Sequence, residues 1–194
     1  MDLGPTSRER LRDLVVRLAV VHEAVTLSSG ARSYYYIDLR RVTLHHEAAP
    51  LVGHLMLDLL EEAGLGAGEI DAVGGLTLGA DPVAAAILHA AASRGQELDA
   101  FVVRKEGKAH GLQRRIEGPD VAGRRVVAVE DTSTTGTSVL TAVAALREAG
   151  AQVKGVAVIV DRGTGARERI AAEGLEYLAV FGLADLGLVG GEPT

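Results

Sequence analysis

Length, composition and charge restrict what this chain can be. Its 194 residues suffice for one domain with a full core, and 47% hydrophobic with 24% charged residues exclude an intrinsically disordered chain. The absence of cysteine excludes disulfides, thiolate metal sites and a cysteine nucleophile. The net charge of −6 argues against nucleic-acid binding, and no apolar run reaches the length of a membrane span. The N-terminus lacks the form of a signal peptide, so we expect a cytoplasmic protein with a single domain over residues 1–194.

Helical and strand patterns alternate along the chain. Leu11, Leu14 and Leu18 recur at helical spacing in the first segment, and Gly64 and Gly150 end two later helices. Strands that alternate with helices in this way predict an α/β domain with a mostly parallel sheet and helices on both faces. The expected helices cover residues 6–22, 46–63, 82–92, 139–149 and 166–173; a β-prone segment lies within 25–41, and strands cover 72–75, 100–103, 126–129, 153–160 and 177–181.

The most informative segment runs from residue 125 to 138. An apolar strand ends in two adjacent carboxylates, Glu130 and Asp131, and in the loop that follows every residue except Gly136 carries a hydroxyl. We expect the carboxylates at the C-terminal edge of the sheet, where α/β proteins bind ligands, and the loop at a helix N-terminus, which suits an anion. A helix cap needs one hydroxyl, so this run exceeds what capping requires. Carboxylates that accept hydrogen bonds from sugar hydroxyls, beside a phosphate site, predict a ribose 5-phosphate ligand.

A polar segment with clustered cations follows the strand predicted at 100–103. It brings Arg104, Lys105, Lys108 and His110 close together, and two of the chain's three lysines stand here although arginine is far more frequent. A mobile loop of this kind can close over a polyanionic ligand and stabilise charge that develops on a leaving pyrophosphate. A solvated surface charge run is the alternative.

Two further turns are less decisive when taken alone. The turn at 74–82 has GxxxxG spacing without the Lys and Ser/Thr of a Walker loop, so either a second phosphate contact or a plain strand-to-helix turn accounts for it. Arg162 follows the strand predicted at 153–160, which places it near the same sheet edge as Glu130 and Asp131. Its planar fork suits a carboxylate or an imide-like edge, although a single such Arg is most often a surface residue.

Taken in this order, the segments resemble the orotate phosphoribosyltransferases of the type I phosphoribosyltransferase family, in particular the actinobacterial members. The resemblance covers about residues 10–187 and implies the type I phosphoribosyltransferase fold, with a small N-terminal hood over about residues 1–42. The motifs that carry it are Thr26-Leu27-Ser28-Ser29-Gly30, Tyr36-Ile37-Asp38, Arg104-Lys105-x-x-Lys108-x-His110-Gly111, Glu117-Gly118, the run from Glu130 to Ser138, and Asp161-Arg162.

The resemblance implies a Mg²⁺-dependent transfer of ribose 5-phosphate from phosphoribosyl pyrophosphate (PRPP) to orotate, which gives orotidine 5-phosphate and pyrophosphate in UMP synthesis. Thr134 and Arg162 would bind orotate, and Mg²⁺ would be held mainly by substrate oxygens and water. It further implies a homodimer that shares the Lys105 loop between subunits, and neither a nucleic-acid nor a membrane partner. The implied catalytic residues are Lys105, Lys108, His110 and Asp131, and the implied PRPP-binding residues are Arg104, Lys105, Lys108, His110, Glu130, Asp131, Thr132, Ser133, Thr134, Thr135, Gly136, Thr137 and Ser138.

The chain also departs from the family pattern. Ser28 and Gly79 stand where many members carry lysines that help to bind orotate or pyrophosphate, and Thr132 and Ser133 stand where apolar residues are usual. Without these lysines we expect either weaker substrate binding or a larger share of it for Lys108, Arg40 or Arg41.

Two alternatives stay open. A related enzyme that uses another base is disfavoured by the cationic loop motif and Arg162, and a PRPP-binding regulator without chemistry is disfavoured by the acidic charge and the intact loop lysines.

Overall fold

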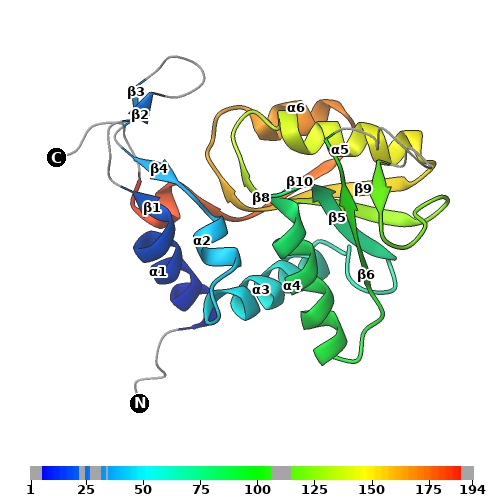
Figure 1. Cartoon of the computed structure of the whole chain (residues 1–194), viewed down its shortest axis with the longest axis horizontal. Helices are drawn as coiled ribbons and strands as arrows, with labels where there is room; N and C mark the ends of the chain where they lie inside the picture. Colours follow the sequence, from blue (N-terminus) through cyan, green and yellow to red (C-terminus); the bar gives the residue numbers. More distant parts are fainter. Residues whose placement is uncertain (1–5, 22–24, 27–31, 34, 106–114, 189–194) are drawn as a thin grey trace.

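The computed structural model describes residues 6–21, 25–26, 32–33, 35–105 and 115–188, and its centre is a six-stranded sheet of order β10-β9-β8-β5-β6-β7 (Figure 1). Every neighbouring pair is parallel except β6 and β7, which are antiparallel. This confirms the predicted α/β class with a mostly parallel sheet. The strands are β5 (Ala72–Leu76), β6 (Asp99–Val103), β7 (Ile116–Glu117), β8 (Arg125–Ser133), β9 (Gln152–Asp161) and β10 (Glu176–Gly182).

Helices cover both faces of the sheet and form two hydrophobic cores (Figure 1). One core packs α1 (Ser7–Ala19), α3 (Ala48–Glu62) and α4 (Ala80–Ser93) against one face. The other packs α5 (Thr137–Glu148) and α6 (Ala166–Ala172) against the opposite face. Because both faces are covered, the first part of β8 is a continuous apolar run and not an alternating one.

The strand order reverses beside β5. The chain runs from β5 to β6 on one side and then crosses to β8 on the other side of β5. Parallel sheets bind ligands outside the carboxyl ends of the strands at such a switch point. The fold therefore points to the segments that follow β5 and β8.

The N-terminal segment adds a small layer in the region predicted to form the hood (Figure 1). Thr6 and Glu9 close a capping box at the start of α1. Antiparallel pairs then join β1 (Val20–Val21) to β4 (Tyr36–Ile37) and β2 (Val25–Thr26) to β3 (Arg32–Ser33), and α2 (Arg40–Thr43) follows. A short 3-10 helix, η1 (Ala184–Leu186), ends the described chain on the α1 side of the sheet.

Most elements differ from their predicted bounds by one or two residues, and some differ in kind or by more. The helix predicted over 6–22 ends at Ala19, because Val20 and Val21 form strand β1. The strand predicted over 126–129 extends to Ser133, because β9 pairs with it as far as Asp161. The helix predicted to begin at Pro82 begins at Ala80, so the proline stands in its first turn. β7 lies in a segment predicted as loop and pairs with β6. Within the described residues, no helix combines the length and apolar character that a membrane crossing requires.

Candidate functional site

The segments that follow β5 and β8 enclose a cavity of about 360 Å³, which is within the range of small-ligand sites. Parts of the molecule far apart in the sequence meet there: the hood, the turn after β5, the end of β6 and residues 125–138, which we call the signature segment. The lining residues are Tyr36, Ile37, Asp38, Leu39, Arg40, Leu76, Thr77, Leu78, Gly79, Lys105, Glu130, Asp131, Thr132, Thr134 and Ser138.

The two carboxylates of the signature segment, Glu130 and Asp131, line this cavity. Glu130 and Asp131 are only 5% and 8% exposed. Burial raises the pKa of both carboxyl groups, and the neighbouring Asp131 charge raises that of Glu130 further. The backbone N–H of Thr132 donates to Asp131 Oδ1 at 2.6 Å. A buried carboxylate pair of this kind is stabilised by a ligand that donates hydrogen bonds to it, as sugar hydroxyls do.

The turn after β5 packs closely against the same carboxylates. A Cβ on Gly79 would overlap Glu130 Oε1 and lie 2.9 Å from Asp131 Oδ1. Any larger side chain at this position would have to displace the Glu130 carboxylate. This gives a physical reason for a glycine where many family members carry lysine.

Asp81 fixes the same turn from the start of α4. Its Oδ2 accepts a hydrogen bond from Thr77 Oγ1 at 2.7 Å, and the backbone N–H of Thr77 donates to the Val103 carbonyl at 2.9 Å. The turn therefore sits in a defined position opposite the carboxylate pair. The sequence-based interpretation did not single out Asp81, although a carboxylate in the first turn of a helix is a recognisable signal.

The hydroxyl loop is shorter than predicted. Because β8 continues through Thr132 and Ser133, only residues 134–136 separate the strand from α5, and Thr137 and Ser138 form the first helical turn. Gly136 has φ of +76°, a left-handed conformation that favours glycine. A hollow of about 50 Å³ lies over this loop, between the end of β8 and the N-terminus of α5.

Arg169 of α6 holds the hydroxyl loop by hydrogen bonds. Its Nη1 donates to the Thr135 carbonyl at 2.8 Å and to Thr137 Oγ1 at 3.0 Å. Thr135 Oγ1 and Thr137 Oγ1 lie 3.0 Å apart and share a hydrogen bond. The loop is thus held in place before any ligand binds. Nothing in the local sequence pattern linked Arg169, which stands more than 30 residues away, to this role.

The predicted cationic loop is only partly described. Lys105 is exposed and lines the cavity. Arg104 lies beside it, with Nη1 3.6 Å from Glu117 Oε1. Lys108 and His110 lie outside the described residues, as does Ser28 of the hood.

Arg162 is close to the signature but does not line the cavity. Its backbone N–H donates to the Ser133 carbonyl at 2.9 Å, so the residue follows the end of β9 beside β8, as expected. Its side chain is half-buried. The residues that surround the cavity include a different arginine, Arg40 of the hood, which the sequence offered as one of three cations that would take over from the missing lysines.

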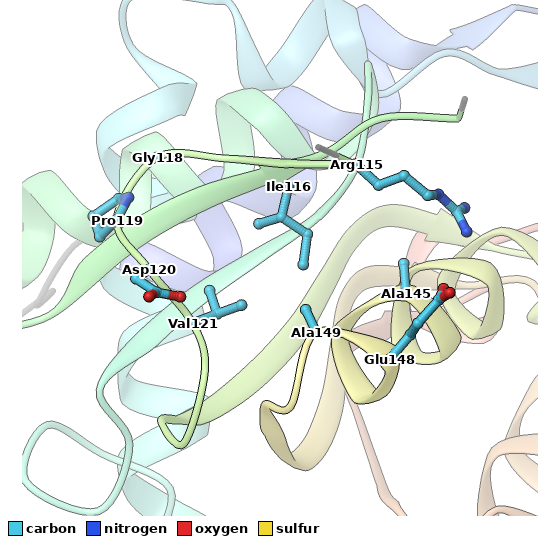
Figure 2. A pocket seen from close by; sticks show the side chains of 9 residues that line it. All are labelled: Arg115, Ile116, Gly118, Pro119, Asp120, Val121, Ala145, Glu148 and Ala149. Atoms are coloured by element: carbon cyan, nitrogen blue, oxygen red, sulfur yellow. The ribbon is translucent and has the colours of Figure 1, made fainter. Parts of the chain in front are cut away.

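A second hollow, of about 370 Å³, lies apart from these groups between the segment after β7 and α5 (Figure 2). Ile116, Val121 and Ala149 form its apolar part, and Arg115 and Glu148 lie at one side. None of the predicted site residues belongs to it.

Known proteins match the chain over most of its length. Residues 40–178 match the phosphoribosyl transferase domain. The orotate phosphoribosyltransferase of Streptomyces coelicolor is 66% identical over 88% of this chain and 91% of its own length. The crystal structure of the Mycobacterium tuberculosis orotate phosphoribosyltransferase with Fe(III) dicitrate has a TM-score of 0.84 at 59% identity, over 94% of this chain and all of that one. The structure of the same enzyme with PRPP has a TM-score of 0.80 at 55% identity, over 94% and 100% of the two chains. The chain therefore belongs to the phosphoribosyl transferase domain family, and within it to the orotate phosphoribosyltransferases.

Proposed function

We propose that this protein transfers ribose 5-phosphate from PRPP to orotate, which gives orotidine 5-phosphate and pyrophosphate in UMP synthesis. The observation that carries the proposal is the buried Glu130–Asp131 pair, set between a fixed turn and a hydroxyl loop at the switch point of the sheet. Its family membership, and the binding of PRPP by a relative of 55% identity, support the same reaction.

In this proposal the signature segment holds the ribose 5-phosphate. Glu130 and Asp131 accept hydrogen bonds from the ribose 2- and 3-hydroxyls. Thr134, Thr135, Thr137, Ser138 and the backbone around Gly136 surround the 5-phosphate at the N-terminus of α5, where N–H groups point outward. Thr132 and Ser133 contribute through the strand backbone, since β8 extends over both residues.

The pyrophosphate group would lie across the turn 77–79 and face the cationic loop. Lys105, with Arg104, Lys108 and His110, stabilises the negative charge that grows on pyrophosphate as its bond to ribose C1 breaks. The electron pair of that bond leaves with pyrophosphate, and a nitrogen of the orotate ring then bonds to C1 from the opposite face. The protein mainly positions the reactants, and no covalent intermediate with a side chain is needed.

The oxygen-rich cavity also fits Mg²⁺. Its lining includes the carboxylates of Asp38, Glu130 and Asp131. Burial raises the pKa of Glu130 and Asp131, and a bound cation would favour their ionised forms. Among the described residues, no three acidic or histidine side chains are grouped as a metal site. We therefore propose that substrate oxygens and water supply most ligands, as is usual for Mg²⁺ with phosphates. When bound, Mg²⁺ would neutralise pyrophosphate charge.

We propose that Arg162, Thr134 and the backbone near Tyr36 bind orotate. Thr134 and Tyr36 line the cavity, whereas Arg162 stands at the adjacent strand end and would have to turn its side chain toward the base. Cytoplasmic location also stays a prediction.

We also propose a homodimer, on a separate observation. Leu44 and Leu78 are 73% and 69% exposed, which is unusual for large apolar side chains. Leu44 lines an apolar hollow of about 410 Å³ over α2, α3 and α4, together with Pro50, Ala85 and their neighbours. Leu78 lines the PRPP cavity, so a second copy that covered both leucines would border the site, within reach of its Lys105 loop. Leu44→Glu should give monomers in sedimentation analysis, and Val16→Glu on α1 should not.

The test of the proposed reaction is an absorbance assay of orotate loss with PRPP and Mg²⁺, with adenine, guanine and uracil as parallel acceptors. We expect turnover with orotate alone. Lys105→Ala should lower kcat about 100-fold or more, as is typical when a charge-stabilising donor is removed. Lys154→Ala, at an exposed position of β9, is the matched control and should leave kcat unchanged. Turnover of another base would refute orotate as substrate, and PRPP binding without turnover of any base would refute the enzyme.

A further inference from the structure

A second cation faces the cavity from the hood. Among the described residues that line the cavity, Arg40 and Lys105 carry positive charge, against the carboxylates of Asp38, Glu130 and Asp131. Even with Glu130 protonated, the remaining carboxylates match the two cations in number, so a polyanionic substrate needs both cations for its binding. Arg40 belongs to no motif that the proposed function assigns.

Asp38 contacts only the Nε edge of the Arg40 guanidinium. Arg40 Nε donates to Asp38 Oδ1 at 2.8 Å, and the backbone N–H of Arg40 donates to the same oxygen at 3.3 Å. Among the described residues, neither terminal nitrogen of Arg40 has a partner. A guanidinium carries five N–H donors, so this contact orients the fork and leaves its outer edge available.

A purely structural role explains this arrangement poorly. The Arg40 side chain is 50% exposed and its partner is two residues away, and exposed ion pairs of this kind contribute little to stability. The Asp38 carboxylate alone suffices to accept from the backbone at the start of α2. Arg40 lines the cavity, where burial raises the pKa of the Asp131 carboxyl and the charge of Arg40 partly offsets that rise. A guanidinium with a free bidentate edge beside an anion-binding cavity is the group that proteins use for carboxylates and phosphates.

We propose that the terminal nitrogens of Arg40 bind an oxyanion of a bound substrate, with Asp38 as the positioning residue that orients them. This inference rests on the proposed function, which supplies two such groups, the pyrophosphate of the donor and the carboxylate of the base. Both offer paired oxygens to the fork. Arg40 thereby supplies the second positive charge of a cavity in which position 79 is a glycine that packs against the Glu130 carboxylate.

The test compares Arg40→Ala and Arg40→Lys with Arg41→Ala. Arg41 is the next residue of α2, is exposed and does not line the cavity, so it is a matched control. Steady-state KM is measured separately for PRPP and for orotate, together with kcat and with calorimetric titration of PRPP and inorganic pyrophosphate. Equal thermal unfolding midpoints of the three variants establish that each is folded.

Arg40→Ala should raise KM for one substrate about ten- to hundredfold, the usual loss for a charge-assisted hydrogen bond, while Arg41→Ala changes it less than twofold. A rise for PRPP with weaker pyrophosphate binding identifies the pyrophosphate, and a rise for orotate alone identifies the carboxylate. Arg40→Lys should recover part of the loss, because it keeps the charge without the fork. Asp38→Asn should cause a smaller rise in the same KM, with kcat retained.

The proposal is overturned if Arg40→Ala and Arg41→Ala behave alike for both substrates. Failure of the proposed function looks different, since wild-type protein would then show no turnover of orotate. In that case PRPP titration still decides the role of Arg40. Weaker binding by Arg40→Ala than by Arg41→Ala supports an oxyanion contact with the donor, and equal binding excludes it.

Discussion

Carboxylates near the two ends of strand β8 lie in opposite environments: Asp71, which precedes β5, contacts the start of β8, and Glu130 and Asp131 belong to its second half. At its start, Arg125 Nη2 donates to Asp71 Oδ1 at 2.7 Å and the Arg125 backbone N–H donates to Oδ2 at 2.8 Å. These hydrogen bonds from Arg125 lower the pKa of Asp71 to about 2. At its far end, Glu130 and Asp131 lie buried beside each other, and burial raises the pKa of both.

This difference separates a structural ion pair from the carboxylates that we propose as a ligand site. The Asp71 carboxylate already has the cation and donors that a charged group needs. Among the described residues, neither Glu130 nor Asp131 makes an ion pair with a cation. Buried carboxylates without such partners are costly to the folded protein and gain from a ligand that donates hydrogen bonds.

The largest effect should come from neutralising the pair. Asp131→Asn should lower kcat/KM for PRPP about ten- to hundredfold, because an amide accepts the ribose hydroxyl bond more weakly than a carboxylate. Asp71→Asn, at the other end of β8, should leave kcat/KM within about twofold. Steady-state kinetics on both variants decides the matter, and equal losses would show that the two ends of the strand do not differ in role.

A smaller loss is expected from crowding the pair. Gly79→Ala places a Cβ where Glu130 Oε1 lies, so the carboxylate must move and KM for PRPP should rise about tenfold. Gly182→Ala is the control, because its Cβ would meet nothing closer than Asp185 Oδ2 at 3.8 Å. An unchanged KM for Gly79→Ala would contradict the close packing of this turn on Glu130.

The pair should also set how stability depends on pH. Burial and the neighbouring Asp131 raise the pKa of Glu130 to about 8, above its value in the unfolded chain. The folded protein therefore binds the extra proton, and stability falls as pH rises from about 5 through 8. Glu130→Gln should flatten this slope, at roughly 1.4 kcal/mol for each pKa unit removed. Urea unfolding at several pH values measures the free energy of unfolding of wild type and Glu130→Gln. The same dependence of this free energy on pH in both proteins would contradict the raised pKa of Glu130.

The smallest effect is expected at the start of the strand and has the opposite sign with pH. Asp71 has a lowered pKa, so its stabilisation is present above about pH 4 and is lost as pH falls toward 2. Asp71→Asn should cost about 1 kcal/mol at pH 7, since this carboxylate is about one-third exposed and solvent weakens the pair. The same urea series tests this, and a loss that grows at low pH would contradict it.

Sequence patterns predicted most helices and strands, because these elements depend on residues that are close together in the chain. Buried β-branched runs, helical spacing and glycine stops located the main helices and strands, and the Glu130–Asp131 pair followed from its place after an apolar strand. The end of β8 was predicted four residues too early, since pairing with β9, and not the polar side chains of Thr132 and Ser133, decides where that strand ends.

What sequence reasoning missed depends on contacts between distant segments. Arg169 supports a loop more than 30 residues away. The sequence offered Arg40 and Arg41 equally, and only the packing of the hood over the switch point of the sheet shows that Arg40 lines the cavity. The sequence shows only that Gly79 replaces a lysine of many family members, whereas the structure shows that Gly79 packs against the Glu130 carboxylate. Local patterns describe residues within a few positions of one another, and none of these three relations is local.

Calorimetric titration of PRPP in buffers of different ionisation enthalpy tests the central claim most directly, because it counts protons released on binding. If the ribose hydroxyls donate to the carboxylate pair, binding favours the ionised form, and wild-type protein should release a proton near pH 7 that Glu130→Gln does not. Equal proton release by the two proteins, with equal affinity for PRPP, would contradict the assignment of the ribose to this pair.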